Sequence, residues 1–384
     1  MDIFFFDNID DNINETQLNF KNLIYNGTLK ELIHFYNKNK DNINLSYRNE
    51  EPFLMSCKQG NIDIIKWLLE EKQDINIIIS NEFAFMTACS NGYLEIAQFI
   101  YEKYKIMNYK SEKYELAFIN SCRSNNIELP KWLLTIKPDI NISIGDEWAF
   151  RNACTFGKLD IAKWLLQIKP NIDIVIRNNY SFCFSCIENQ IEIVKWLLEI
   201  KPDIYISYYN ETIFPQCSKW GLLDIMKLLY QKNPLINNYV NFNICFYIAC
   251  KHNNIDIIYW LLQIRPDIDT TFNNNKAFYK VCNYKNINFD LIKLFLDKNP
   301  TMINTIDSTK INKQAKEYIL SLGYIFPLKW IDIIKLSNNL IDCPICSEEI
   351  NEYVETPCNH KFCKPCIERW IETNSICPCC RYQV

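Results

Sequence analysis

The chain has 384 residues, of which 48% are hydrophobic and 14% aromatic, enough apolar material for two or three ordinary domains or one long repeat array. Its formal net charge of −4 argues against a nucleic-acid or other polyanionic partner. No apolar run approaches the roughly 18–20 residues of a membrane span, so we expect no membrane partner either.

The first residues, MDIFFFDNIDDNI, are too short and too acidic a stretch to be a signal peptide. We therefore expect an intracellular, cytoplasmic protein. In that reducing compartment the 18 cysteines serve as thiols or metal ligands rather than as disulfides. Residues 1–15 form an N-terminal segment ahead of the first regular pattern.

Residues 16–305 repeat themselves with a period of 32 or 33 residues. The pattern is clearest in GNIDIIKWLLE (60–70) and GKLDIAKWLLQ (157–167), and similar copies begin at residues 92, 125, 189, 221 and 253. A poorer copy at 27–37 and a stretched one at 286–298 bring the array to about nine repeats. A fixed period of this size predicts an all-α solenoid.

Each position of the repeat has a physical reason. It opens with a residue that tolerates the left-handed conformation of a tight turn, namely Gly27, Gly60, Gly92, Gly157, Gly221, Asn125, Asn189 or Asn253. An acid three residues later suits the first turn of a helix. The helix that follows is apolar on nearly every side, which predicts that neighbouring repeats sandwich it. A proline stops it in six repeats, at positions 138, 170, 202, 234, 266 and 300.

The preceding helix of each repeat carries one cysteine: Cys57, Cys89, Cys122, Cys154, Cys186, Cys217, Cys250 and Cys282. Successive repeats stack about a helix diameter (~10 Å) apart, too far for these thiols to share a metal ion. We therefore expect them to be small buried apolar residues.

The helix–turn–helix repeat resembles the ankyrin repeat, although NEFAF and DEWAF replace the usual Thr-Pro-Leu-His and Lys-Pro replaces the usual glycine after the second helix. The resemblance implies binding of another protein along a concave face of turns and first helices, without catalysis. The matching turn tips are Asn81, Asp146, Asn178, Asn210 and Asn273, and for any one of them a solvated turn is the simpler interpretation. The Ile/Asn/Lys/Tyr-rich composition also resembles ankyrin proteins of giant DNA viruses, which would place the protein in a host cytoplasm.

Residues 306–339 connect the array to a C-terminal module. The stretch 307–323 predicts a helix with an Asp/Ser start and a Gly stop. An apolar stripe follows, formed by Trp330, Ile331, Ile333 and Ile334. A membrane or partner helix is the functional alternative, but without a basic polar face the stripe favours a helix that caps the last repeat.

Within residues 340–384, eight cysteine and histidine residues fall into ordered pairs: Cys343 with Cys346, Cys358 with His360, Cys363 with Cys366, and Cys377 with Cys380. Zinc takes four nitrogen or sulfur ligands in a tetrahedron, and a two-residue gap lets both thiolates of a pair reach one ion. Eight ligands therefore predict two closed, structural zinc sites with no open position for a catalytic water.

Three other cysteine patterns are weaker evidence for a functional site. Cys183 and Cys186 also form a Cys-x-x-Cys, but no strand–turn context indicates redox chemistry. Cys250 and His252 are two apart on a helix and point in different directions, which argues against a nucleophile–base pair. The two-residue gap favours Cys380 over Cys379 as a ligand, although a switch to Cys379 stays open.

The order of three cysteines, one histidine and four cysteines over residues 343–384 resembles the RING finger, a small α+β cross-brace module. This resemblance implies that Cys343, Cys346, Cys363 and Cys366 hold one ion while Cys358, His360, Cys377 and Cys380 hold the second. About 42 residues have too little core to fold alone, so zinc must supply the stability, on the order of 10–16 kcal/mol per ion.

The resemblance also implies recruitment of a ubiquitin-conjugating enzyme. Ile345, Trp370 and Pro378 match the family's shallow apolar groove, and Arg381 matches the linchpin cation that bridges the conjugating enzyme and its ubiquitin. No residue of the chain forms a covalent intermediate, because a substrate lysine attacks the thioester on the conjugating enzyme. The repeats would select the substrate.

We therefore predict a RING-type ubiquitin-protein ligase with two structural zinc ions. The alternative is a non-enzymatic ankyrin scaffold or adaptor whose RING is purely structural. A zinc-dependent nucleic-acid binder is opposed by the acidic charge balance.

Overall fold

The computed structural model describes residues 13–72, 77–104, 111–202, 204, 210–232, 240–326, 334–371, 374 and 376–381, without the side chains of 77–82, 104, 111, 210 and 211. The chain divides into two compact units, residues 1–241 and 242–384, and each is described by itself. No helix within these described ranges is long and apolar enough to cross a membrane.

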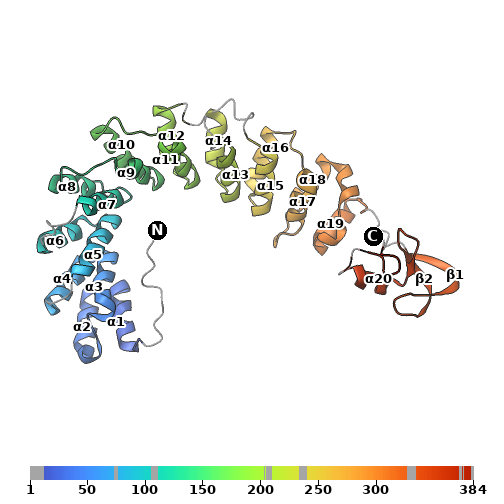
Figure 1. The fold of residues 1–384 in the computed structure, drawn as a ribbon, viewed down its shortest axis with the longest axis horizontal. Helices are drawn as coiled ribbons and strands as arrows, with labels where there is room; N and C mark the ends of the chain where they lie inside the picture. Colours follow the sequence, from blue (N-terminus) through green and yellow to red (C-terminus); the bar gives the residue numbers. More distant parts are fainter. Residues whose placement is uncertain are drawn as a thin grey trace. The chain divides into compact units, whose positions relative to one another are not determined.

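The first unit consists of paired antiparallel helices (Figure 1). They are α1 Glu15–Asn26, α2 Leu29–Asn39, α3 Tyr47–Gln59, α4 Ile62–Glu71, α5 Ile77–Asn91, α6 Leu94–Tyr104, α7 Ser111–Ser121, α8 Glu128–Ile136, α9 Ile144–Thr155, α10 Leu159–Ile168, α11 Ile176–Ile187, α12 Ile191–Ile200, α13 Asn210–Trp220 and α14 Leu223–Lys232, with a 3-10 turn η1 at Lys40–Asn42. Each odd-numbered helix packs on the next odd-numbered one, so α1 to α13 form one layer and their partners form the other.

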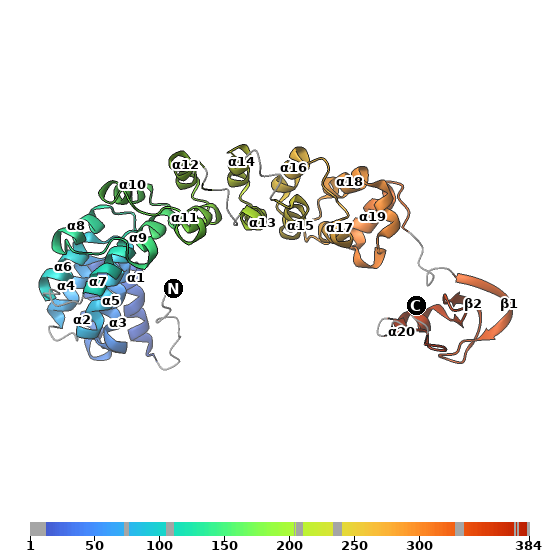
Figure 2. The same cartoon turned by 45° about the horizontal axis from the view of Figure 1, so that its top comes forward.

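The second unit continues with α15 Phe242–His252, α16 Ile255–Ile264, α17 Phe272–Cys282, α18 Phe289–Lys298, η4 Pro300–Thr305, η5 Ser308–Lys310 and α19 Lys313–Ser321. A small antiparallel sheet in the order β1-β2-β3 follows (Figure 2), formed by β1 Ile334–Asp342, β2 Glu349–Glu355 and β3 Lys361–Phe362. Helix α20, Lys364–Ile371, completes it.

The connecting segment differs in part from its prediction. The helix predicted over 307–323 begins only at Lys313, because the Asp307 side chain accepts from Thr309 N–H and closes η5 first. Gly323, with φ +86°, follows the end of α19, and α19 packs on α18 as a cap would. Ile334 opens strand β1 instead of extending a helical stripe, and the other three stripe residues lie outside the described residues.

A ladder of phenylalanines that the sequence analysis missed forms the core of the repeats. One fully buried ring lies on the first helix of each pair, at intervals of 32 or 33 residues: Phe20, Phe53, Phe85, Phe118, Phe150, Phe182, Phe214, Phe246 and Phe278. The rings reach into the next repeat. Phe118 on α7 meets Trp164 on α10 with ring centroids 6.3 Å apart, and Phe150 meets Trp196 at 6.2 Å. Phe20 and Phe85 make the same kind of contact with Trp67 and Trp132, so the ladder joins several pairs of neighbouring repeats.

The repeat cysteines are buried, as predicted, and burial raises the pKa of thiols such as Cys57 and Cys89. Cys217 is buried as well, but it lies one position earlier in its repeat than the others do. The other cysteines follow a ladder phenylalanine by four residues, a position that Ser218 occupies after Phe214. The Ser218 hydroxyl there donates to the Phe214 carbonyl over 2.8 Å.

The turns within the pairs are left-handed where predicted at Gly60, Gly92, Gly157, Gly221, Asn189 and Asn253. The prediction is wrong at Gly27, where φ is −94° because Thr28 caps α2 from an extended conformation. Asn125 does not have a positive φ either, and the Asn126 side chain accepts from Glu128 N–H at the start of α8.

Three predicted turn tips lie in short left-handed stretches of three residues that open first helices. Asp146 lies in 145–147 of α9, Asn178 in 177–179 of α11 and Asn273 in 273–275 of α17. Residues 48–50 of α3 repeat this geometry. The side chains of Asn81 and Asn210 lie outside the described residues. Left-handed non-glycine residues are strained, so each stretch needs local support, such as the Ser143 hydroxyl that donates to the Glu147 carboxylate over 2.6 Å.

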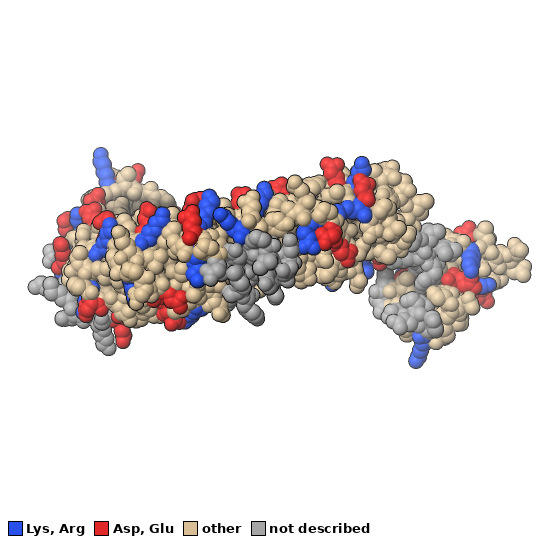
Figure 3. All heavy atoms as spheres, turned by 90° about the horizontal axis from the view of Figure 1, so that it is seen from above, with Lys and Arg blue, Asp and Glu red and all other residues tan. Residues whose placement is uncertain are grey.

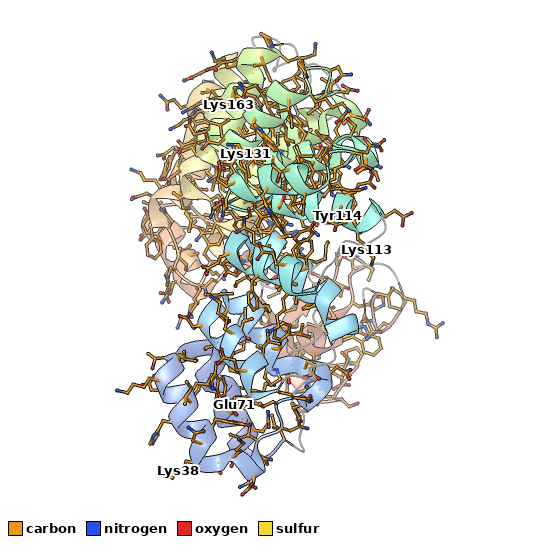
Figure 4. All side chains as sticks on the ribbon, turned by 90° about the vertical axis from the view of Figure 1, so that its left-hand side faces the viewer. Lys38, Glu71, Lys113, Tyr114, Lys131 and Lys163 are labelled. Atoms are coloured by element: carbon orange, nitrogen blue, oxygen red, sulfur yellow. The ribbon has the colours of Figure 1, made fainter. Side chains whose placement is uncertain are left out.

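Charges on the second helices are paired along the helix. Lys131 and Lys163 occupy equivalent positions on α8 and α10 (Figure 4), and Lys131 contacts Glu128 three residues earlier over 2.8 Å. Lys195 contacts Glu192 at the same spacing and distance. Acidic and basic side chains are consequently interspersed over the described part of one face (Figure 3).

We predict that Phe150→Ala lowers the free energy of unfolding of the repeats by about 3–5 kcal/mol, because it removes a buried ring and one inter-repeat contact. Urea denaturation followed by far-ultraviolet circular dichroism measures this. The control is Phe156→Ala, just beyond the end of the same helix, where the ring is 41% exposed and a loss below about 1 kcal/mol is expected. Equal losses in the two variants would contradict a structural role for the ladder.

Candidate metal centre

Two tight turns shape the first and last Cys-x-x-Cys pairs in the same way. In the first, Ser347 N–H donates to the Cys343 carbonyl over 2.8 Å, and Ser347 has φ 61°. In the last, Arg381 N–H donates to the Cys377 carbonyl over 3.0 Å, and Arg381 has φ 59°. These hydrogen bonds fold each pair back so that both sulfurs can face one point.

The structure brings Cys343, Cys346, Cys363 and Cys366 together, with their sulfurs all within 4.8 Å of one another. The Sγ atoms of Cys343 and Cys363 are 3.7 Å apart, and those of Cys346 and Cys363 are 3.9 Å apart. Four thiolates about 2.3 Å from a tetrahedral zinc ion are about 3.8 Å from each other. The first tetrad therefore has the dimensions of a structural zinc site.

A second tetrad consists of Cys358, His360, Cys377 and Cys380, again with ligand atoms within 4.8 Å of one another. Nδ1 of His360 is buried, and no hydrogen-bond partner reaches it from the part of the chain that the structure describes. A buried nitrogen without a partner is costly, and a bond to zinc removes that cost. Together the tetrads fit two structural zinc ions.

The pKa values of the cysteines in the first tetrad are also consistent with a bound cation. Burial pushes the pKa of Cys343 upward, but backbone N–H groups of Cys346, Cys363 and Ile345 outweigh it and lower that pKa to about 7. The pKa of Cys363 is raised to about 12, first by burial and then by its contacts with neighbouring thiols. Thiolates packed this closely repel one another, so a divalent ion is needed to hold all four ionised.

Thr356 supports the second tetrad and was not found from the sequence. Its backbone N–H donates to the His360 carbonyl over 2.9 Å, and its hydroxyl oxygen accepts from His360 N–H over 3.0 Å. The same oxygen lies 3.2 Å from Cys358 Sγ. Thr356 thus sets the Cys-x-His turn. The sequence shows only that Thr356 lies two residues before Cys358, and ligand spacing alone assigns no role to that position.

Few apolar side chains are buried next to the two tetrads. The buried cluster contains Val354, Phe362 and Ile367 together with Cys343 and Cys377, one ligand from each tetrad. A core this small does not hold a fold without the metal.

The predicted docking residues lie around the tetrads. Ile345, 39% exposed, stands between two ligands of the first tetrad, and half-buried Pro378 stands between two ligands of the second. Trp370 on α20 is half-buried and donates from Nε1 to the Ile376 carbonyl over 2.8 Å. Arg381 is exposed. That these four form one groove stays a prediction.

The remaining cysteine patterns show no comparable site. Cys379 is exposed and belongs to neither tetrad. Burial raises the pKa of Cys183 to about 12 and that of Cys186 further, which disfavours the thiolate that redox chemistry needs. Cys250 is buried whereas His252 is exposed, so the structure does not pair them as nucleophile and base.

Comparison with known families agrees with this geometry. A model of the Ring finger domain matches residues 341–381, and a model of ankyrin repeats in three copies matches residues 21–112. The chain is an ankyrin-repeat protein with a C-terminal RING finger domain.

Several characterised proteins are similar to parts of this ankyrin–RING protein. RING finger protein 141 of Gallus gallus is 25% identical over 96 residues, which are 25% of this chain and 41% of that protein. RING finger protein 151 of Bos taurus is 45% identical over 42 residues, 11% of this chain and 18% of that protein. E3 ubiquitin-protein ligase ICP0 of Suid herpesvirus 1 is 42% identical over 52 residues, 13% of each chain. The matches thus span less than half of each relative. The resemblance to giant-virus ankyrin proteins stays a prediction.

We predict that the purified protein carries two zinc ions per chain, measured by native mass spectrometry. Cys380→Ser should lower this number, because it removes a tetrad ligand, whereas Cys379→Ser should retain both ions. Chelation should unfold the RING but leave the far-ultraviolet helical signal of the repeats. Loss of zinc from Cys379→Ser but not from Cys380→Ser would show that Cys379 is the ligand.

We also predict that Thr356→Val weakens zinc binding at the second tetrad about 10- to 100-fold, because the turn that orients Cys358 and His360 loses its hydroxyl. Competition with a chromogenic chelator measures the affinity. Thr309→Val provides the control, since that hydroxyl donates to Asp307, the N-cap of η5, far from both tetrads in the sequence. An unchanged affinity in Thr356→Val would rule out the supporting role.

Proposed function

We propose that this protein is a RING-type ubiquitin-protein ligase. The observation that carries the proposal is the pair of closed tetrads with an exposed Ile345 between ligands of one and Arg381 directly after the last ligand of the other. Similarity to a viral E3 ubiquitin-protein ligase over 52 residues supports the same class.

In this mechanism the protein supplies no nucleophile. When bound, zinc would only fix the fold, since each tetrad already fills four positions. The amine of a substrate lysine attacks the thioester between ubiquitin and the conjugating enzyme. The C–S bond breaks, an isopeptide bond forms, the conjugating enzyme regains its cysteine thiolate, and the amine loses a proton to solvent. The ligase contributes by holding the reactants together in a reactive orientation.

Each proposed docking residue has a physical role. Ile345, Trp370 and Pro378 offer apolar contacts, and the hydrogen bond from Trp370 Nε1 to the Ile376 carbonyl orients the indole ring. Arg381 can donate to carbonyl groups on the conjugating enzyme and on ubiquitin at once, which a lysine does poorly. The ankyrin repeats would bind the substrate. We place this activity in the cytoplasm, where the thiols stay reduced.

We predict that the zinc-loaded protein forms ubiquitin chains on itself in a reconstituted reaction with a panel of conjugating enzymes. Ile345→Ala and Arg381→Ala should each slow the reaction at least about 10-fold, because each removes a contact that orients the loaded conjugating enzyme. The control is Cys379→Ser, which changes an exposed thiol outside both tetrads. If zinc-loaded wild-type protein gave no ubiquitin ladder with any conjugating enzyme, the ligase proposal would fail and an ankyrin scaffold would remain.

A further inference from the structure

An aromatic and cationic cluster lies on two neighbouring first helices of the first unit, α9 and α11, which pack directly against each other (Figure 1). We call it the α9–α11 cluster. Its members are Trp148, Arg151, Arg177, Tyr180 and Phe184. Aromatic and arginine side chains of this kind dominate the energetic centres of protein interfaces.

Arg151 organises the cluster. Its Nε donates to the Asp146 carbonyl over 2.9 Å and its Nη2 to the Gly145 carbonyl over 2.8 Å. The guanidinium lies 4.7 Å from the centre of the Tyr180 ring, and that ring stacks on Phe184 with centroids 4.1 Å apart. These contacts fix the left-handed stretch of α9 against the next repeat, so a partner meets a surface that is already ordered.

Two side chains of the cluster reach the solvent. Trp148 is 43% exposed, and its ring lies against Gly145, where an added Cβ would come within 3.2 Å of the indole. The Arg177 side chain is 57% exposed and contacts Asp146 Oδ2 over 2.7 Å. Trp148 and Arg177 thus contact adjacent residues of the chain, Gly145 and Asp146.

The cluster itself contributes two positive charges, those of Arg151 and Arg177. Arg177 pairs with the exposed Asp146 carboxylate, whereas Arg151 donates to the Asp146 and Gly145 carbonyls. The nearby Glu147 is buried, and it accepts hydrogen bonds from the Ser143 hydroxyl over 2.6 Å. Burial lowers the pKa of Arg151, and the positive charge of Arg177 lowers it further, which indicates that the two cations feel each other. A carboxylate from a partner would relieve that repulsion.

Trp148 does not lie at the position that tryptophan takes in five of the repeats. Trp67, Trp132, Trp164, Trp196 and Trp260 share one position on the second helices, but Trp148 lies on a first helix, two residues before the ladder ring Phe150. Phe83, Leu116 and Tyr180 occupy this same position in neighbouring repeats. Apolar side chains thus recur from one first helix to the next, at a spacing of about 10 Å. An extended peptide covers that distance in about three residues.

We propose that the α9–α11 cluster is a docking site for an extended protein segment that carries an aromatic or large aliphatic side chain within about three residues of an aspartate or glutamate. Trp148 contacts the apolar side chain, and Arg177 binds the carboxylate. This assignment rests on the proposed ligase function in one respect, that the docked segment belongs to a substrate. The docking itself does not depend on ubiquitin transfer.

The test uses the full zinc-loaded chain and a displayed library of random 12-residue peptides. Peptides selected by the wild-type protein should pair an apolar side chain with a nearby acid. A fluorescent copy of the best peptide should bind at least 10-fold more weakly to Trp148→Ala and to Arg177→Glu, measured by anisotropy. Trp220→Ala is the matched control, because that indole is 58% exposed on the same unit, has Lys219 at 4.5 Å and lies outside the cluster. Its affinity should stay within about 2-fold.

Charge exchange separates recognition from a general loss of fold. Arg177→Lys should retain most of the binding, and Arg177→Glu should prefer a copy of the peptide in which lysine replaces the acids. Selected peptides without acids, or equal binding by Trp148→Ala and wild type, would overturn the proposal. Because no conjugating enzyme is present, this result and the result of the ubiquitin reaction are read separately.

Discussion

The contact on which the repeats depend is an aromatic one between neighbours. In several places a phenylalanine on the first helix of one repeat reaches a tryptophan on the second helix of the next, as Phe118 does with Trp164. A single pair of helices is too small to bury these rings alone, so each repeat obtains part of its core from the adjacent one. The stability of the array therefore resides in its interfaces, and a gap in the ladder affects two repeats at once.

The RING region also has too small an apolar core, but it is stabilised in a different way. Its buried cluster joins three apolar residues to Cys343 and Cys377, which belong to different tetrads. Metal coordination there replaces the apolar neighbour that a repeat has. The chain thus uses its cysteines in two ways. In the repeats burial suppresses the thiolate, as at Cys57, whereas backbone N–H groups around Cys343 favour it.

The sequence was sufficient for features that follow from periodicity or ligand spacing. The repeats, most of the left-handed turn residues and the eight ligand residues are of this kind. The division of the ligands into two tetrads came instead from the resemblance to the RING finger. The phenylalanine ladder was missed because helices that are apolar on most faces do not reveal which ring crosses to the next repeat. Thr356 was missed because its role depends on hydrogen bonds that only the folded turn creates. At Gly27 and Ile334 the neighbouring cap and strand pairing decided the backbone, which a single-residue preference cannot show.

The left-handed stretches that open first helices have a further consequence. The same backbone is formed by Arg-Asn-Glu at 48–50, Gly-Asp-Glu at 145–147, Arg-Asn-Asn at 177–179 and Asn-Asn-Asn at 273–275. The middle residue is asparagine in three of them and aspartate in the fourth, so the turn keeps its shape when that residue carries a charge. Because each repeat contacts mainly its neighbours, such changes accumulate one repeat at a time without disturbing the stack. Tip residues of such an array can therefore be exchanged one repeat at a time while the stack and the RING keep their structure.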